Sequence, residues 1–196
     1  SNFSFLEGVS HPEEMVLRAR ELELPAIAIA DRDGLYGVAR AHVEARKVEQ
    51  KLIVAAELTL EPGPDLRAGP ERLVLLAKDH EGYTNLCRLL TRAHAEHEKG
   101  EAAIDVREVA ACAAGLIAIA PLGVREADLG RLAVLREAFG HDLLIAAWRH
   151  LDGLDPVRTA RAEHAAARLD VAVVAAARPL FHAASRRALC DVVHCI

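Results

Sequence analysis

Short apolar runs alternate along this chain with longer segments in which apolar residues recur every three or four positions. The runs AIAIA at 26–30 and VAVVAAA at 171–177 are typical of buried strands. The segment at 80–100 has helical spacing, since Leu86 and Leu90 lie one turn apart. Strands are predicted at 26–30, 52–60, 72–78, 115–120, 142–148 and 171–177, and helices at 11–23, 35–48, 80–100, 106–113, 129–139, 155–169 and 184–196. This alternation predicts an α/β fold with a parallel sheet covered by helices.

The start of the first helix carries a recognisable capping pattern. Ser10 and Glu13 stand in the spacing S-x-x-E, with Pro12 in the first turn. A serine and a glutamate at this spacing can satisfy two free backbone N–H groups at a helix start. We therefore expect a capping box at these residues.

The connections between the strands favour a barrel over a dinucleotide-binding sheet. They vary in length, and no G-x-G-x-x-G follows the first strand. A barrel or barrel-like α/β domain is the first choice. In such a barrel the reactive side chains lie at the C-terminal ends of the strands.

Composition restricts the class of protein further. The 196 residues suit one domain, which could belong to a longer chain, and 52% hydrophobic with 4% aromatic content predicts an aliphatic core. A net charge of −5 argues against a surface that grips nucleic acid by itself. The four cysteines form no C-x-x-C pair, which makes a zinc ribbon an unfavoured interpretation. No signal peptide or long apolar span is visible, so a cytoplasmic protein is expected.

Polar residues gather where the predicted strands end. Asp31 and Asp33 follow the first strand, Glu57 lies within the second, and His150 follows the strand at 142–148. These oxygen and imidazole groups could converge on a divalent metal ion. Arg32 and Arg178 would add positive charge to the same rim; Arg178 directly follows the last strand.

Each of these residues also has an interpretation without metal. Asp31 and Asp33, beside a glycine, could form an Asx-type turn that caps the next helix. Glu57 in an apolar strand needs a partner, which Arg32 or Arg178 could supply as an ion pair. His150 could be an ordinary loop residue. Of the remaining histidines, His94 and His97 are interpreted as part of a solvated helix face, while His182 and His194 have no acidic or cysteine partner at a telling spacing.

Five segments carry a resemblance to a known family: SNFSFLEGVSHPEE, DRDGLYG, AAELTL, LVLLAKDHEGYTNLCRLLTRAH and RRALCDVVHCI. They resemble the PHP (polymerase and histidinol phosphatase) domain of bacterial C-family DNA polymerases, above all the error-prone ones. The resemblance spans essentially the whole chain and implies a single PHP-type domain over 1–196, a fragment of a longer polymerase. It also implies a distorted seven-stranded β/α barrel. In active members three metal ions at one barrel mouth hydrolyse phosphoesters, in some polymerases as a 3′–5′ exonuclease.

Several positions depart from the family pattern. The family's first strand ends in His-x-His just before the segment that matches Ser1, so the resemblance implies a barrel without that strand here. The family's Asp-His-Asp-Gly is Asp31-Arg32-Asp33-Gly34 in this chain, and its late Asp-x-His aligns with Arg178-Pro179-Leu180. Glu57 matches a family glutamate ligand, and His150 is a weaker match to a family histidine. Arginine is only a donor and cannot ligate a metal, so Arg32 and Arg178 are expected to pair with Asp31, Asp33 or Glu57.

The resulting hypothesis is a structural module with no catalytic residue. The relic metal-site positions are Asp31, Arg32, Asp33, Glu57, His150, Arg178 and Leu180. No metal is expected in this domain; Glu57, His150 and Asp31 are the weak candidates as ligands. The parent polymerase would hold Mg²⁺ in its palm, and this domain would contact the remaining domains, with DNA bound through them and no membrane involved. The alternatives are a metal-dependent phosphoesterase or 3′–5′ proofreading exonuclease, and a free-standing binding domain.

Overall fold

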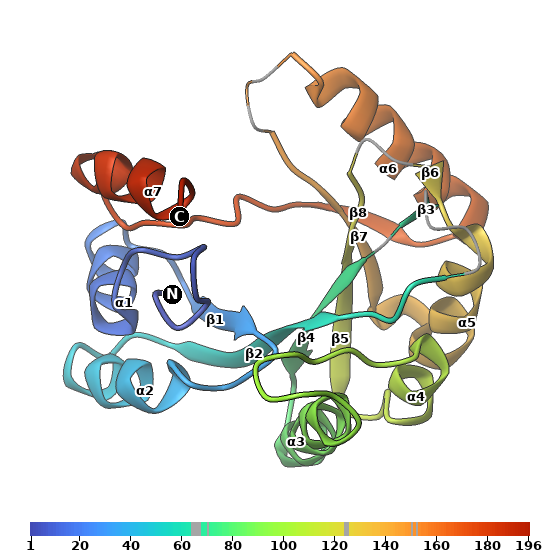
Figure 1. Cartoon of the computed structure of the whole chain (residues 1–196), viewed down its shortest axis with the longest axis horizontal. Helices are drawn as coiled ribbons and strands as arrows, with labels where there is room; N and C mark the ends of the chain where they lie inside the picture. The colour runs from blue at the N-terminus through green and yellow to red at the C-terminus, as the bar shows by residue number, and fades with distance from the viewer. Residues whose placement is uncertain (64–67, 70, 124–125, 150, 152) are drawn as a thin grey trace. The chain divides into compact units, whose positions relative to one another are not determined.

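The computed structural model describes residues 1–63, 68–69, 71–123, 126–149, 151 and 153–196. The chain divides into two compact units, which are described separately (Figure 1). The first unit comprises Ser1–Ala56 and Pro179–Ile196, and the second comprises Glu57–Arg178. Strand β2 (Leu52–Thr59) passes from the first unit into the second.

The first unit is built around a small aliphatic cluster. Its elements are α1 (Pro12–Glu21), β1 (Ile27–Arg32), α2 (Val38–Lys47), the first part of β2, a 3₁₀ turn (Ala184–Arg186) and α7 (Arg187–Val193). Helices α1 and α2 pack against each other, and β1 neighbours β2. Val16, Ile29, Ala41 and Ala45 are buried together between these elements. Small alanines on α2 let the two helices approach closely.

The capping box at Ser10 and Glu13 is a wrong prediction, displaced by one residue. The N-cap of α1 is His11, whose backbone N–H donates to Glu14 Oε2 at 2.8 Å. Pro12 occupies the first helical position, where its missing N–H costs nothing. Glu13 instead forms an ion pair with Arg40 of α2, in which Glu13 Oε1 and Arg40 Nε lie 2.6 Å apart. The shift arises because both glutamates could close a box, and Arg40 takes one of them.

The second unit contains a sheet of strand order β2-β4-β5-β7-β8. Its further strands are β4 (Arg72–Ala77), β5 (Leu116–Pro121), β7 (Leu143–Ala147) and β8 (Ala172–Ala175). The pairs β5–β7 and β7–β8 are parallel, as predicted. A short parallel pair of β3 (Ala68–Gly69) and β6 (Glu126–Ala127) was not expected from the sequence.

The prediction of an all-parallel sheet is wrong at β4 and β5, which run antiparallel. Ala77 at the end of β4 pairs with Leu116 at the start of β5, and the N–H of Lys78 donates to the carbonyl of Gly115 at 2.9 Å. The two strands therefore form an antiparallel pair that is joined by a long, mainly helical connection. Two helices lie within it, where a parallel crossover would usually have one.

Helices cover the sheet of the second unit and close an aliphatic core. They are α3 (His80–Ala95), α4 (Val106–Ala111), α5 (Leu129–Phe139), a 3₁₀ turn (Gly140–Asp142) and α6 (Asp155–Leu169). Helix α3 packs on β4 and β5, α6 packs on β7 and β8, and α4 lies against α5 (Figure 1). The fully buried side chains are mainly leucines, including Leu73, Leu75, Leu86, Leu132 and Leu143. Within the described ranges, none of the helices has the length and apolarity needed to cross a bilayer.

A close backbone contact explains the glycine in the first turn of α3. A Cβ atom on Gly82 would lie 1.9 Å from the carbonyl oxygen of Gly115, which itself has a φ of +70°. The N–H of Gly82 also donates to Asp79 Oδ1, the side chain that caps α3, at 2.8 Å. The start of α3 thus rests directly on the turn before β5.

Substituting Gly82 with alanine is therefore expected to lower the free energy of unfolding by about 2 kcal/mol, because backbone atoms must move to admit the methyl group. Gly123→Ala is the control, since apart from its chain neighbours no atom of the described residues lies within 4 Å of the added methyl group there. Urea unfolding of the two variants measures the difference. Equal stabilities for both would mean that the contact between α3 and the β5 turn yields easily.

Candidate functional site

Asp31 stands at the end of β1 and is only 1% exposed. Its Oδ1 accepts hydrogen bonds from the hydroxyl groups of Ser1 at 2.7 Å and Ser4 at 3.1 Å. Its Oδ2 accepts the backbone N–H of Gly37, the N-cap of α2, at 3.1 Å. Both oxygens are thus engaged by protein donors. Asp31 thereby ties the end of β1 to the start of α2; this hydrogen bond spans six residues, whereas the Asx-type turn of the sequence interpretation would bond the backbone about two residues on.

Arg32 forms an ion pair with a residue that the sequence analysis did not suggest. Its guanidinium pairs with Glu7, with Nη1 and Oε1 2.9 Å apart, and not with Asp31 as one of the expectations had it. Its backbone N–H donates to Ser4 Oγ at 3.0 Å, which links it to the same turn. Asp33 follows in the left-handed region, with φ of 50°. Glu7 was missed because the segment that carries it has no helical or strand periodicity.

Glu57 is buried on β2 and bound by two arginines of the second unit. It is 4% exposed, and its Oε2 lies 2.7 Å from Arg178 Nη2 and 3.1 Å from Arg72 Nη1. The ion pair between Glu57 and Arg178 was expected from the sequence, whereas Arg72 at the start of β4 was not. Charge-assisted hydrogen bonds of this length are strong, and two of them compensate a carboxylate that is hidden from water.

An aromatic ring fixes the position of Arg178. Its guanidinium carbon lies 5.6 Å from the centroid of Trp148, within the range of a cation–π interaction. Trp148 in turn donates its indole N–H to the carbonyl of Leu122 at 3.2 Å. Arg178 has a φ of 42°, an unusual backbone conformation for a residue with a side chain. We call Glu57, Arg72, Arg178 and Trp148 the Glu57 cluster.

The remaining predicted site positions contribute no ligand in the described structure. Leu180 belongs to the first unit, and its carbonyl accepts the N–H of Val9 at 3.0 Å. His150 lies outside the described residues. Among the residues that the structure describes, no three His, Cys, Asp or Glu side chains are grouped so as to hold a metal ion.

The residues present do not fit the metal centre that the resemblance implies. Both oxygens of Asp31 receive protein hydrogens, and one oxygen of Glu57 receives two guanidinium groups. Arg32 and Arg178 are donors, and Leu180 has an apolar side chain. Within the described residues, protein donors thus occupy both oxygens of Asp31 and one oxygen of Glu57, where the family pattern would have metal ions.

A polar cluster around His182 lies within the first unit and was missed by sequence reasoning. The His182 Nδ1 atom lies 2.8 Å from Ser10 Oγ and 3.7 Å from Glu14 Oε2. Glu14 also pairs with Arg186. Burial raises the pKa of Glu14, but the N–H of His11 and the charges of Arg186 and His182 outweigh burial and lower it. In a catalytic triad the serine and the carboxylate contact different ring nitrogens of the histidine, whereas here Ser10 and Glu14 both contact Nδ1. Ser10 is also fully buried. The cluster therefore holds two segments of the chain together and is not a catalytic triad.

The interpretation of His94 and His97 as two positions of one solvated helix face is wrong for His97. Helix α3 ends at Ala95, so His97 lies beyond it. The Nδ1 atom of His97 is buried and has no hydrogen-bond partner among the described residues. This ring lines a small cavity of about 280 Å³ together with three glutamates and an arginine.

Comparisons with known proteins show which family the chain is similar to. Residues 1–169 match the model of the PHP domain family. An error-prone DNA polymerase of Anaeromyxobacter dehalogenans is 45% identical over all of this chain, and one of Bordetella parapertussis is 37% identical over all of it. The chain spans only 17% and 20% of the lengths of these two relatives.

A solved structure shares the fold. It is a candidate metal-dependent phosphoesterase of Bifidobacterium adolescentis, with a TM-score of 0.59 and 18% identity over 90% of this chain and 84% of that one. The α/β fold predicted from the sequence is thereby confirmed. The chain belongs to the PHP domain family and is homologous over its whole length to part of the bacterial error-prone DNA polymerases.

Proposed function

We propose that this chain is the PHP domain of an error-prone DNA polymerase and serves there as a structural module without hydrolytic activity. Identity of 45% and 37% over the entire chain supports the assignment to such a polymerase. The relatives are several times longer than this chain, so the synthesis of DNA would reside in domains beyond it.

The observation that carries the structural role is the Glu57 cluster. The carboxylate of Glu57, which matches a family glutamate ligand, is bound by Arg72 and Arg178 at 3.1 and 2.7 Å. A phosphoesterase of this kind needs carboxylates that are free to bind cations and to share them with a phosphate. In this proposal guanidinium charge takes the place of the cation beside Glu57, which compensates the buried carboxylate and leaves no cation there to activate water.

The parent protein would add deoxynucleotides to a primer during damage tolerance and repair. Mg²⁺ would be bound in its palm, and no cofactor would be needed in the PHP domain. The partners of this domain would be the remaining domains of the polymerase, with DNA bound through them, in the cytoplasm. The net charge of −5 suits a module that does not itself hold DNA.

The rival function is a metal-dependent phosphoesterase or a 3′–5′ proofreading exonuclease. The support for this rival function is the fold that the chain shares with the candidate phosphoesterase. This support is weak, because proteins with the same fold can have different activities. It would require metal to displace the arginines from Glu57.

Two measurements on the purified protein separate the proposals. The chain is incubated with Zn²⁺, Mn²⁺ or Fe²⁺ and dialysed, its metal content is determined, and degradation of 3′-labelled single-stranded DNA is followed. We expect substoichiometric metal and no degradation. Stoichiometric metal together with degradation that Glu57→Gln abolishes would establish the rival function. The Glu57→Gln control excludes a contaminating nuclease, because a contaminant would be unaffected.

The polymerase assignment is tested separately by the parent gene and protein. The reading frame that follows Ile196 is expected to encode finger and palm domains, and the full-length protein is expected to extend a primed DNA template with Mg²⁺. A frame that encodes no such domains would overturn the assignment.

A further inference from the structure

Helix α6 borders a cavity of about 640 Å³ in the second unit. Its apolar wall comes from one face of α6 and from the start of α5; the residues are Leu129, Pro156, Val157, Ala160 and Ala165. A volume of this size lies within the range of small-molecule sites, roughly 300–1,000 Å³. The cavity thus has the dimensions and the apolar lining of a ligand site.

On this wall, one guanidinium nitrogen of an arginine has no hydrogen-bond partner among the described residues. Arg161 lines the cavity, and its Nη1 atom is buried without a hydrogen-bond acceptor among the described residues. One turn earlier, Arg158 pairs with Asp155 at 3.0 Å, so the helix does supply partners to its other inward-facing arginine. A buried donor is nearly always satisfied in proteins, by protein, water or ligand, and a buried charge is normally paired. Arg161 as a whole is half-buried, but its Nη1 atom therefore calls for an acceptor that the described residues do not provide.

We propose that this cavity binds a small organic anion, with an apolar body against α6 and a carboxylate, phosphate or sulfonate on Arg161. The guanidinium can offer two parallel N–H groups to such an acid. His164 also lines the cavity, three residues further along α6, and adds a second polar group next to the anion. The apolar residues supply the remainder of the binding energy by burying hydrocarbon surface. This inference is independent of the proposed role in a polymerase.

The proposal is tested with a matched pair of dyes on the full chain. The anionic probe is 8-anilinonaphthalene-1-sulfonate, and the uncharged one is N-phenyl-1-naphthylamine; both fluoresce when an apolar site takes them up. The decisive variant is Arg161→Gln. Arg168→Gln is its charge-matched control, because Arg168 lies exposed on the same helix.

We expect Arg161→Gln to weaken binding of the sulfonate at least about tenfold, about 1.4 kcal/mol, and to leave binding of the uncharged dye unchanged. Arg168→Gln should change neither dye. Ala160→Trp, which fills the cavity but keeps Arg161, should abolish binding of both. Thermal unfolding of each variant confirms that it is folded.

Three results would overturn the proposal. One is an equal effect of Arg161→Gln and Arg168→Gln on the sulfonate. Another is an equal loss of both dyes in Arg161→Gln, which would show a purely apolar surface. The third is undiminished sulfonate binding in Ala160→Trp, which would place the dye elsewhere on the protein.

Discussion

Replacing Arg72 and Arg178 together with alanine is expected to lower the free energy of unfolding by about 3–5 kcal/mol, the usual cost of leaving a buried charge without its partner. Both arginines bind the same oxygen of Glu57, which is 4% exposed and cannot turn into water. Arg178→Ala alone should cost less, because Arg72 still compensates the carboxylate. Loss of the stacking on Trp148 adds to the effect of either variant that lacks Arg178.

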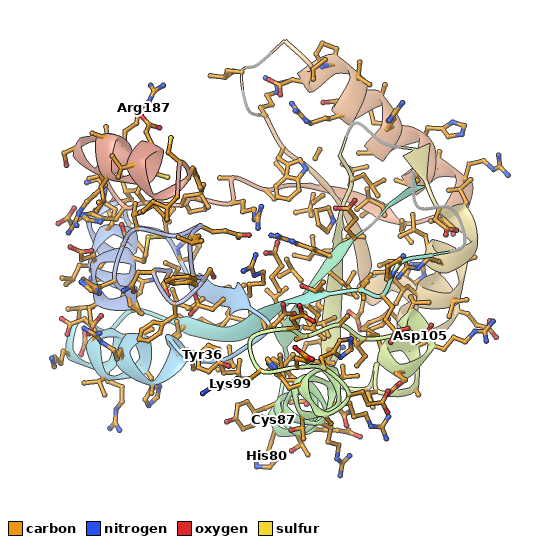
Figure 2. The ribbon with its side chains drawn as sticks, viewed as in Figure 1. Tyr36, His80, Cys87, Lys99, Asp105 and Arg187 are labelled. Atoms are coloured by element: carbon orange, nitrogen blue, oxygen red, sulfur yellow. The ribbon has the colours of Figure 1, made fainter. Side chains whose placement is uncertain are left out.

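Urea unfolding of the single, double and triple variants measures this coupling. Adding Glu57→Leu to the double variant removes the stranded charge and is expected to restore part of the stability. Arg187→Ala is a suitable control, because the Arg187 side chain on α7 (Figure 2) is 79% exposed and its ion pair with Asp191 lies on the surface. If the double variant were no less stable than the control, the Glu57 cluster would be solvated and of little energetic weight.

The second large effect is expected at Asp31, where substitution with alanine should cost about 3 kcal/mol. The change leaves the hydroxyl group of Ser4 and the N–H of Gly37 without their acceptor in a buried place. Asp31→Asn should cost less, since its amide oxygen can still accept one of these hydrogens. The lost hydrogen bonds lie in the turn before α2, so we expect local unfolding of this helix to become easier before the rest of the domain is affected.

Hydrogen exchange at the amide of Gly37 reports directly on this contact, and chemical denaturation gives the overall loss. Asp191→Ala serves as the reference, since Asp191 is 70% exposed in its contact with Arg187. A wild-type exchange rate at Gly37 in the Asp31→Ala variant would contradict the role assigned to this carboxylate.

Local pattern in the sequence predicted most of the elements but not how distant ones meet. The apolar runs correctly indicated the strands that became β1, β2, β4, β5, β7 and β8, and the low aromatic content indicated an aliphatic core. The antiparallel pairing of β4 and β5 was missed because strand direction depends on where the chain returns, which periodicity does not encode. Helix ends were shifted by a few residues for a similar reason, as at α1, where Arg40 of another helix selects between two glutamates.

The contacts of the candidate site, too, were predictable from the sequence only in part. A carboxylate in an apolar strand must have a partner, and this requirement pointed from Glu57 to Arg32 or Arg178, of which Arg178 is the one that pairs with it. The same logic could not identify Arg72, which lies in an ordinary strand, or Glu7, which lies in a segment without pattern. The Arg161 cavity had no sequence signal at all, because an arginine on an amphipathic helix reads as a solvated residue until its surroundings are known.

The hydrogen bond between Lys78 and Gly115 has a consequence for how this domain tolerates change. The chain leaves the sheet and re-enters it at neighbouring points, so the segment between them is a closed loop, which is held in addition at Ile104 by hydrogen bonds with Thr59 and Glu61. Lengthening such a loop raises the entropy cost of closure only slowly with the number of residues. Residues inserted between Lys99 and Gly100, which are exposed and precede the buried Ile104, should therefore leave the register of β4 on β5 intact, which makes this point a natural place to graft a tag or a foreign segment.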